Sequence, residues 1–433
     1  MKKNSVWLIL LILIIPLGSV RTEITTKGVT VMQLKNGLTV ILDDDRQSPV
    51  VSMQLWVRAG SIYENEKNYG LSHFLEHLVF KGTEKYSAEV LSKLAETSGG
   101  VINAATSKEF TFYFIDIVKE EQQLALSILS QIAFAATFPP AELEKERPVV
   151  IEEIRRHEDN PEGRLSDDFF QIICPNSNYR NRVIGSSEVI KNVSRPDIIN
   201  YYKNFYRPEN MVLSISGNIA ENLLEEIERT FGSYSAPAPF RTEPVNLSVE
   251  PGKFLAKKEK VTQGYFLSGW KGPKNNEIDK LLAAEITATV LGGGRASRFY
   301  QNLREKKHLV YDIGVNFEAQ LGDGIFIVSA IFPPAKRPAL IKEINQEFAR
   351  LRKAGITEPE LYRAKQILKS SWLFAQEAQH ERAQIYAYWS ILNNPSYPQQ
   401  YLQVLEGLNL KDVNNFIQQF PPELSGIIYV PEK

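Results

Sequence analysis

Residues 73–77 read His73-Phe-Leu-Glu76-His77, and this pentapeptide decides how the rest of the chain is interpreted. Positions i, i+3 and i+4 of an α-helix share one face, so the two imidazoles and the carboxylate would project together. Imidazoles at this spacing can hold a metal ion beside a carboxylate that serves as a general base. Because the chain has only 5 His in 433 residues, chance explains such a pair poorly.

The flanking sequence predicts a helix over this pentapeptide. A β-like run, Val50–Val57, is followed by a polar stretch at residues 63–69. Apolar residues then recur at helical spacing, and Ser72 is expected to be the N-cap. The order H-x-x-E-H is that of inverted zinc peptidases rather than the commoner H-E-x-x-H.

A third metal ligand is expected, because catalytic zinc usually has three protein ligands and one open position. The acidic segment 139–156 begins with paired prolines, which suit a helix start. Its residues Glu142, Glu152 and Glu153 are all candidates on chemistry alone. Glu146 lies two turns before Glu153, on the same face, where it could support a ligand from behind. Pro148, between them, removes a backbone donor and is expected to kink the helix.

The run from His73 to Thr83 resembles the pitrilysin/insulinase family of zinc peptidases, in the branch with mitochondrial processing peptidase and its bacterial relatives. The resemblance extends from about Val29 to Val430. It implies a Zn²⁺ cofactor, although Mn²⁺ or Co²⁺ in the same ligands stays open.

The same resemblance implies roles for individual residues. The family's third ligand follows the second histidine by about seventy-six residues, which selects Glu153 beside His73 and His77. Glu76 and Glu146 are then the catalytic glutamates. Glu76 is expected to take a proton from water and pass it to the leaving amine, and Glu146 to support the ligands.

Two further blocks resemble substrate-binding parts of the family. Residues 97–114 resemble its substrate-facing loop and edge strand, which implies Asn103 and Ala104 as substrate-binding residues. We expect the edge strand itself at Phe110–Ile115, where an extended peptide would pair through its backbone.

In the second half, residues 291–311 resemble the family's glycine loop and its Arg-to-Tyr pair, which implies that Arg304 and Tyr311 hold substrate. The glycines do not predict a nucleotide loop, because no Gly-Lys-Ser/Thr follows them.

The composition is that of an ordinary globular protein. A length of 433 residues predicts two or more domains. With 50 Lys+Arg against 51 Asp+Glu, nothing suggests a nucleic-acid partner. The single cysteine, Cys174, excludes an internal disulfide and is expected to be a small buried hydrophobic residue. His380 is expected to be solvated.

The first twenty residues predict a signal peptide. A basic start, Met1–Asn4, precedes the apolar run Val6–Ile15 and small residues up to Val20. Export to the periplasm or the extracellular space is therefore expected, and an uncleaved membrane anchor over residues 6–20 is the alternative.

The rest of the chain divides into two similar halves. A Pro/Ser-rich linker at 233–245 separates a zinc-binding peptidase domain, 21–232, from a metal-free homologous domain, 246–433. The start of the acidic segment recurs 218 residues later, where Ala364 and Ser371 replace Glu146 and Glu153. We expect an α+β fold of two homologous halves, each an antiparallel-rich sheet packed against helices. The resemblance adds that the halves face each other across a substrate chamber.

These features predict a zinc metalloendopeptidase that cleaves peptides or unfolded polypeptides in an enclosed chamber. A homodimer is expected, with a heterodimer of related chains as an alternative. The competing function is that of a non-catalytic or partner-dependent peptide-binding subunit of a processing protease.

Overall fold

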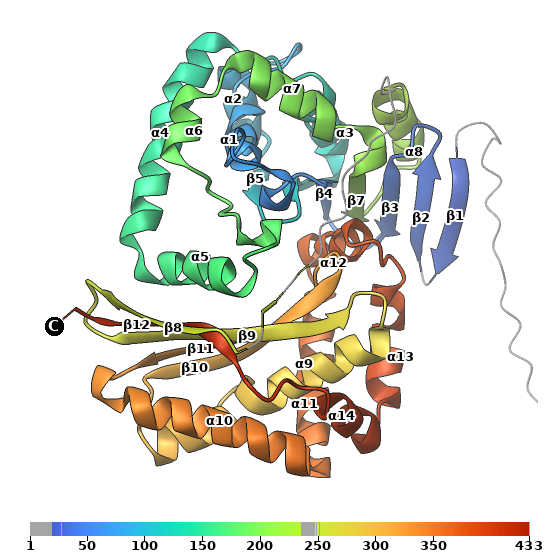
Figure 1. Cartoon of the computed structure of the whole chain (residues 1–433). Coiled ribbons are helices and arrows are strands. Elements are labelled where there is room, and N and C mark those ends of the chain that lie inside the picture. Colours follow the sequence, from blue (N-terminus) through green and yellow to red (C-terminus); the bar gives the residue numbers. More distant parts are fainter. Residues whose placement is uncertain (1–19, 27, 235–246, 248, 251, 433) are drawn as a thin grey trace, which may run out of the picture.

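The computed structural model describes residues 20–26, 28–234, 247, 249, 250 and 252–432. The chain forms two halves, each a β-sheet covered by helices, which lie one above the other in Figure 1. The predicted signal segment and the predicted linker fall almost wholly outside the described residues. Within the described ranges, no helix is both long enough and apolar enough to cross a membrane.

The first sheet has seven strands in the order β1-β2-β3-β7-β4-β6-β5. Its neighbouring strands are antiparallel except β3 and β7, which confirms the expected antiparallel-rich sheet. The strands are β1 (Val20–Thr26), β2 (Val29–Leu34), β3 (Thr39–Asp44), β4 (Val50–Val57), β5 (Val101–Thr106), β6 (Thr111–Val118) and β7 (Met211–Gly217).

The prediction that residues 110–115 form the edge strand is wrong. These residues lie mostly in β6, which pairs with β4 on one side and β5 on the other. Their aromatic and β-branched side chains suit an interior strand as well as an edge one, so composition could not decide between them. Among the described strands, the edge on this side of the sheet is β5, which contains Asn103 and Ala104.

Helices of the first half pack around this sheet. Leucine, isoleucine and tyrosine side chains from these helices join the apolar face of β4 and β7 in one core. The helices are α1 (Leu71–Leu78), α2 (Ala88–Thr97), α3 (Gln122–Phe134), α4 (Pro140–Asp159), α5 (Pro161–Ile173), α6 (Ser187–Asn192), α7 (Arg195–Phe205) and α8 (Leu223–Ile227), with short turns η1 (Ser61–Tyr63), η2 (Lys119–Glu121), η3 (Asn178–Arg180), η4 (Pro208–Asn210) and η5 (Glu228–Gly232).

The second sheet repeats the first in a shorter form. Its order, β10-β11-β9-β12-β8, corresponds strand for strand to β5-β6-β4-β7-β3, and again one pair, β8 and β12, is parallel. The strands are β8 (Phe254–Glu259), β9 (Gly264–Lys274), β10 (Asp312–Glu318), β11 (Asp323–Phe332) and β12 (Ser425–Pro431). The helices are α9 (Ile278–Gly292), α10 (Arg337–Ala354), α11 (Glu358–Ala375), α12 (Gln379–Ile391), α13 (Tyr397–Gly407) and α14 (Leu410–Ile417), with turns η6 (Tyr300–Lys306) and η7 (Pro334–Lys336).

The two halves exchange one helix each. Helix α5 packs on β9 and β12 of the second sheet, and α12 packs on β4 and β7 of the first. The first residues of α5 and α12, Pro161 and Gln379, are 218 residues apart. The same separation relates the first residues of α4 and α11, Pro140 and Glu358. Two small apolar cores lie at these contacts, one around Phe169 of α5 and one around Ile391 of α12. The halves are therefore joined by packed hydrophobic side chains.

Strand β4 shows why α12 is needed. Its alternate residues Val51, Met53, Leu55 and Val57 face the first core, while Ser52, Gln54 and Trp56 are buried on the other face. The Gln54 amide donates to the His380 carbonyl of α12 at 2.9 Å. The helix therefore covers this face of β4 and also provides a hydrogen-bond acceptor for a buried polar side chain.

Candidate metal centre

The pentapeptide lies on α1, as predicted, but the residue that caps the start of this helix differs from the expectation. The N-cap is Gly70 rather than Ser72, whose hydroxyl instead lies 2.6 Å from that of Tyr201. Ser72 is buried in the first turn, so its side chain cannot turn back to cap the helix. The apolar side of α1 is buried in the first core, and its other side carries His73, Glu76 and His77.

Helix α4 brings Glu153 to the two histidines. Nε2 of His77 lies 3.4 Å from Oε2 of Glu153, and Nε2 of His73 lies 3.7 Å from the same oxygen. One donor atom from each residue lies within 4.8 Å of the others. The three half-buried side chains thus form the one such cluster of His, Cys, Asp and Glu within the described ranges.

This arrangement fits a metal ion. Ligands held at about 2.1 Å around a tetrahedral ion lie about 3.4 Å apart, close to the separations seen here. Those separations exceed the ~2.9 Å of a hydrogen bond, so the three groups are not simply bonded to one another. Two imidazole nitrogens and one carboxylate oxygen are a donor set that zinc accepts.

The two histidines of the cluster differ in their electrostatics. Burial, with His77 alongside, lowers the pKa of His73 to about 4, so its imidazole is neutral at neutral pH. Burial also opposes a charge on His77, but the carboxylates of Glu146, Glu153 and Glu76 outweigh it and raise that pKa.

Glu146 lies behind His77. Its Oε1 is 2.9 Å from Nδ1 of His77, and its Oε2 is 2.7 Å from Nζ of Lys81. These two contacts overcome burial and lower the pKa of Glu146. Pro148 lies within α4, and the helix continues to Asp159, so Glu146 and Glu153 belong to one helix.

Thr106 holds the candidate general base. Its hydroxyl donates a hydrogen bond to Oε2 of Glu76, and lies 3.3 Å from the hydroxyl of Thr111. Burial raises the pKa of Glu76, and the bond from Thr106 partly offsets this. Thr106 is the last residue of β5, so the edge strand ends at the carboxylate of Glu76.

The sequence interpretation gave no role to Thr106 or Lys81. Their positions in the sequence, close to residues that were given roles, are the only signal that could have pointed to them. Lys81 follows His77 by four residues, and Thr106 ends the strand that contains Asn103 and Ala104. Asn103 is exposed on β5, and its side chain accepts from the Ala104 N–H at 2.8 Å.

Arg304 and Tyr311 lie in the other half. Arg304 lies in η6 with its guanidinium 4.8 Å from the ring centre of Tyr300. Tyr311 directly precedes β10 and is 54% exposed, so its phenol is free to meet a ligand. In the described part of the chain, no hydrogen bond or ion pair joins either residue to the metal cluster.

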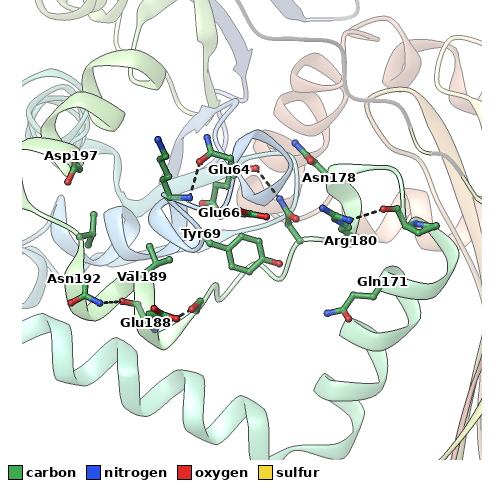
Figure 2. A pocket seen from close by; sticks show the side chains of 16 residues that line it. Glu64, Glu66, Tyr69, Gln171, Asn178, Arg180, Glu188, Val189, Asn192 and Asp197 are labelled. Atoms are coloured by element: carbon green, nitrogen blue, oxygen red, sulfur yellow. Dashed lines mark hydrogen bonds between the residues drawn. The ribbon is translucent and has the colours of Figure 1, made fainter.

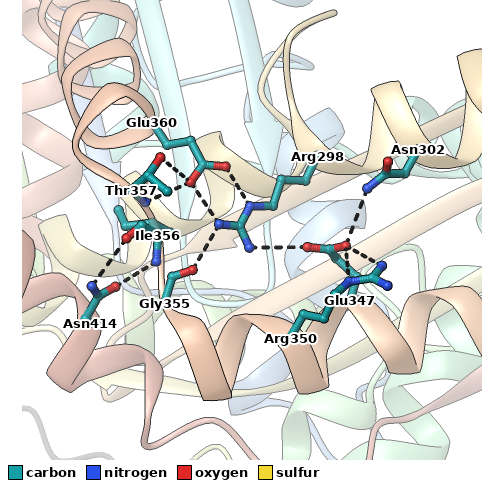
Figure 3. Close-up of polar contacts among 9 residues, drawn as sticks. All are labelled: Arg298, Asn302, Glu347, Arg350, Gly355, Ile356, Thr357, Glu360 and Asn414. Carbon is teal, nitrogen blue, oxygen red and sulfur yellow. Dashed lines mark hydrogen bonds and ion pairs between the residues drawn. The ribbon is translucent and has the colours of Figure 1, made fainter.

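An ionic network anchors the segment that leads to Arg304 (Figure 3). Arg298 forms a two-pronged contact with Glu360, at 2.7 and 2.8 Å, and contacts Glu347 at 3.2 Å. Its guanidinium also donates to the Gly355 carbonyl at 2.9 Å. Burial opposes the charge on Glu360, but its bonds with Arg298 and Thr357 outweigh this and lower the pKa of Glu360 to about 2.

A cavity of about 1180 Å³ borders residues 64–67 and Tyr69, which precede α1 (Figure 2). Its walls are polar and include Tyr69, Arg180 and Glu188, but none of the residues of the metal cluster. The cavity is therefore separate from the candidate centre.

The fold and the cluster define a class: a two-half α+β protein with an inverted H-x-x-E-H metal-ligand cluster in its first half. Family models agree with this class. Insulinase (Peptidase family M16) matches residues 39–185, and Peptidase M16 inactive domain matches residues 192–368. The chain belongs to the pitrilysin/insulinase family of zinc peptidases, family M16.

Individual relatives support the assignment. The uncharacterized zinc protease YmxG of Bacillus subtilis is 28% identical over 390 residues, covering 89% of this chain and 94% of that protein. A protease from Helicobacter pylori has the same fold, with a TM-score of 0.87, 24% identity, and coverage of 93% of this chain and 99% of that one.

A Pseudomonas fluorescens structure named as a peptidase M16 inactive domain also matches the fold, with a TM-score of 0.86, 17% identity, and coverage of 94% and 98%. The expected fold class and zinc cofactor agree with these comparisons.

Proposed function

We propose that this protein is a zinc metalloendopeptidase that cleaves peptides or unfolded polypeptides. One observation carries the proposal: β5, whose outer edge is unpaired in the part of the chain that the structure describes, ends at Thr106, which holds Glu76 beside the cluster of His73, His77 and Glu153. A strand edge that can bind an extended peptide thus leads directly to a carboxylate and a metal-ligand set.

The ligands in this proposal are His73, His77 and Glu153. A bound zinc ion supplies Lewis-acid chemistry, which polarises a carbonyl group and makes water more acidic. Glu76 accepts a proton from the attacking water and returns it to the leaving amine. Thr106 fixes one oxygen of Glu76, so the other stays available for this proton transfer.

Substrate binding follows from the edge strand. An extended peptide adds to β5 next to Asn103 and Ala104, and its register there brings a peptide bond to Glu76. Backbone pairing reads few side chains, so in this proposal selectivity depends on whether a chain is extended and fits an enclosed chamber between the two halves. Arg304 and Tyr311, in the second half of the chain, donate hydrogen bonds to the peptide.

We further propose that the protein is exported and works as a homodimer. The basic and apolar character of residues 1–20 supports export. A heterodimer with a related chain, and an anchor over residues 6–20, are the competing possibilities, and the mature N-terminus and the mass in solution distinguish them.

The experiment is cleavage of a quenched fluorescent peptide library by the purified protein, with chelator and then with added zinc. We expect cleavage that chelation abolishes and zinc restores, and a Glu76→Gln variant that binds zinc but does not cleave. Full activity in Glu76→Gln would reject the mechanism. A zinc-loaded wild type that never cleaves would favour the non-catalytic subunit, for which the inactive-domain neighbour is a precedent in fold.

A further inference from the structure

The N-cap position of α1 has no room for the side chain of a usual capping residue. Gly70, its N-cap, has φ of +93°, and a Cβ there would lie 2.7 Å from the Cα of Gly185. A Ser, Thr, Asp or Asn at this position is therefore excluded, because the backbone conformation and the contact with Gly185 both require glycine. The N–H groups of the first turn need another acceptor.

Glu64 supplies that acceptor from six residues upstream. Its Oε2 accepts from the Gly70 N–H and its Oε1 from the Ser72 N–H, each at 2.7 Å. The carboxylate is buried, with 1% of the residue exposed, although it lies at the wall of the large cavity (Figure 2). Burial raises the pKa of Glu64 to about 7, despite these hydrogen bonds.

The backbone of Glu64 is held in turn by Asn181. The Asn181 amide donates to the carbonyls of Ser61 and Glu64, at 3.0 and 3.1 Å. Residues 64–67 and Tyr69 border the cavity, so side-chain packing does not enclose this segment on that side. The start of α1 is therefore fixed by these hydrogen bonds together with the burial of Leu71, its first residue, in the first core.

The start of α1 sets the position of the metal ligands. His73 lies one residue after Ser72, and His77 lies one turn further on the same helix. We propose that Glu64 is a positioning residue for the metal centre, which caps α1 with both carboxylate oxygens and thereby holds His73 and His77 toward Glu153. This inference rests on the metal site of the proposed function, and it adds a residue that touches neither metal nor substrate.

The test is zinc affinity, measured by competition with a chromophoric chelator, together with thermal unfolding. In Glu64→Gln one N–H of the helix start faces an amide NH₂ instead of an oxygen. We expect the zinc dissociation constant to rise about 10- to 100-fold, as for other residues that orient metal ligands.

Glu109→Gln is the matched control. Glu109 is also a buried glutamate of the first half, accepting from the Tyr179 hydroxyl and from the Leu321 N–H at 2.6 Å, neither of which belongs to α1. We expect this variant to lower the thermal midpoint while binding zinc as the wild type does. Equal zinc affinity in the two glutamine variants would overturn the proposal.

Glu64→Asp keeps the test decisive if the glutamine variant does not fold. It retains the buried carboxyl group at the helix start, but a side chain shorter by one methylene cannot reach both N–H groups. We expect an intermediate loss of zinc affinity, and a wild-type value in a folded Glu64→Asp would overturn the proposal. Because the readout is metal binding, lost affinity alongside an inactive wild type would reject the peptidase function and leave the role of Glu64 standing.

Discussion

Nδ1 of His77 and Oε1 of Glu146 lie 2.9 Å apart, so the second nitrogen of this imidazole is the one directed at Glu153. The contact fixes the ring on the side away from the metal cluster. In metal sites, such outer partners orient the ligand and increase its basicity. The ion pair of Glu146 with Lys81 keeps the carboxylate charged and in place.

Replacing Glu146 with Gln should therefore weaken zinc binding. We expect the dissociation constant to rise about 10- to 100-fold, since the ring of His77 loses its charged partner. Chelator competition measures this. Glu144→Gln, on the same helix with its side chain 65% exposed, serves as the control and should bind zinc normally. Similar affinities in both variants would contradict the role of Glu146.

Thr106→Val should impair catalysis without removing metal. A hydrogen bond to a charged group contributes about 1.5–3 kcal/mol, so kcat/KM should fall roughly 10- to 100-fold. Thr106→Ser keeps the hydroxyl and should retain most activity. The measurement is steady-state cleavage of a fluorescent peptide alongside zinc content. A valine variant as active as the serine variant would show that Glu76 needs no such partner.

Zinc should stabilise the folded protein through Glu153. Binding at 100 times the dissociation constant adds about 2.7 kcal/mol to the free energy of unfolding, and a chelator should remove it. We expect Glu153→Gln to lose most of this zinc-dependent rise in the thermal midpoint. Glu152→Gln, the neighbouring residue with its side chain 48% exposed, should keep it. The opposite result would make Glu152 the third ligand.

The junction of the two halves should respond to pH through His380. The prediction that His380 is solvated is wrong: its Nδ1 lies 2.9 Å from Asp116 Oδ2, and its ring packs on Phe114. The bond to Asp116, aided by Glu381, raises the pKa of His380 against the effect of burial.

A raised histidine pKa stabilises the fold fully below the unfolded value of ~6.5, and this is lost as pH rises through the folded value. His380→Gln should therefore cost up to ~1 kcal/mol near pH 5.5 and less near pH 8, because the pair is partly exposed. Urea unfolding at both values checks this. A loss that grows with pH would contradict the assignment.

Arg298 should matter far more for stability than its neighbour Arg350. Removing Arg298 leaves Glu347, which is 4% exposed, and Glu360 without their buried partner, a change that typically costs about 3–5 kcal/mol. Arg350 also contacts Glu347, at 2.7 Å, but its side chain is 52% exposed. We expect Arg298→Met to lower the unfolding free energy by that amount and Arg350→Met by under ~1 kcal/mol. Equal losses would show that the network does not depend on Arg298.

The sequence by itself determined the local elements. The spacing of apolar residues predicted α1, the paired prolines predicted the start of α4, and the run Val50–Val57 is β4 residue for residue. The repeat at 218 residues anticipated two similar halves, and Cys174 is buried as expected. Such features depend on neighbours within a few turns of chain, so their physical causes are visible in the sequence.

Only the tertiary structure decided how distant segments meet. Ser214 of β7 would suit a solvated sheet face, yet it is buried and donates to the Ala383 carbonyl of α12 at 2.9 Å. The choice of β5 as the edge, the cap of α1 by Glu64, and the exchange of α5 with α12 likewise join residues that no local pattern connects. Each is fixed by the burial of surfaces and the pairing of polar groups between segments that are far apart in the sequence, and local sequence patterns do not reveal such contacts.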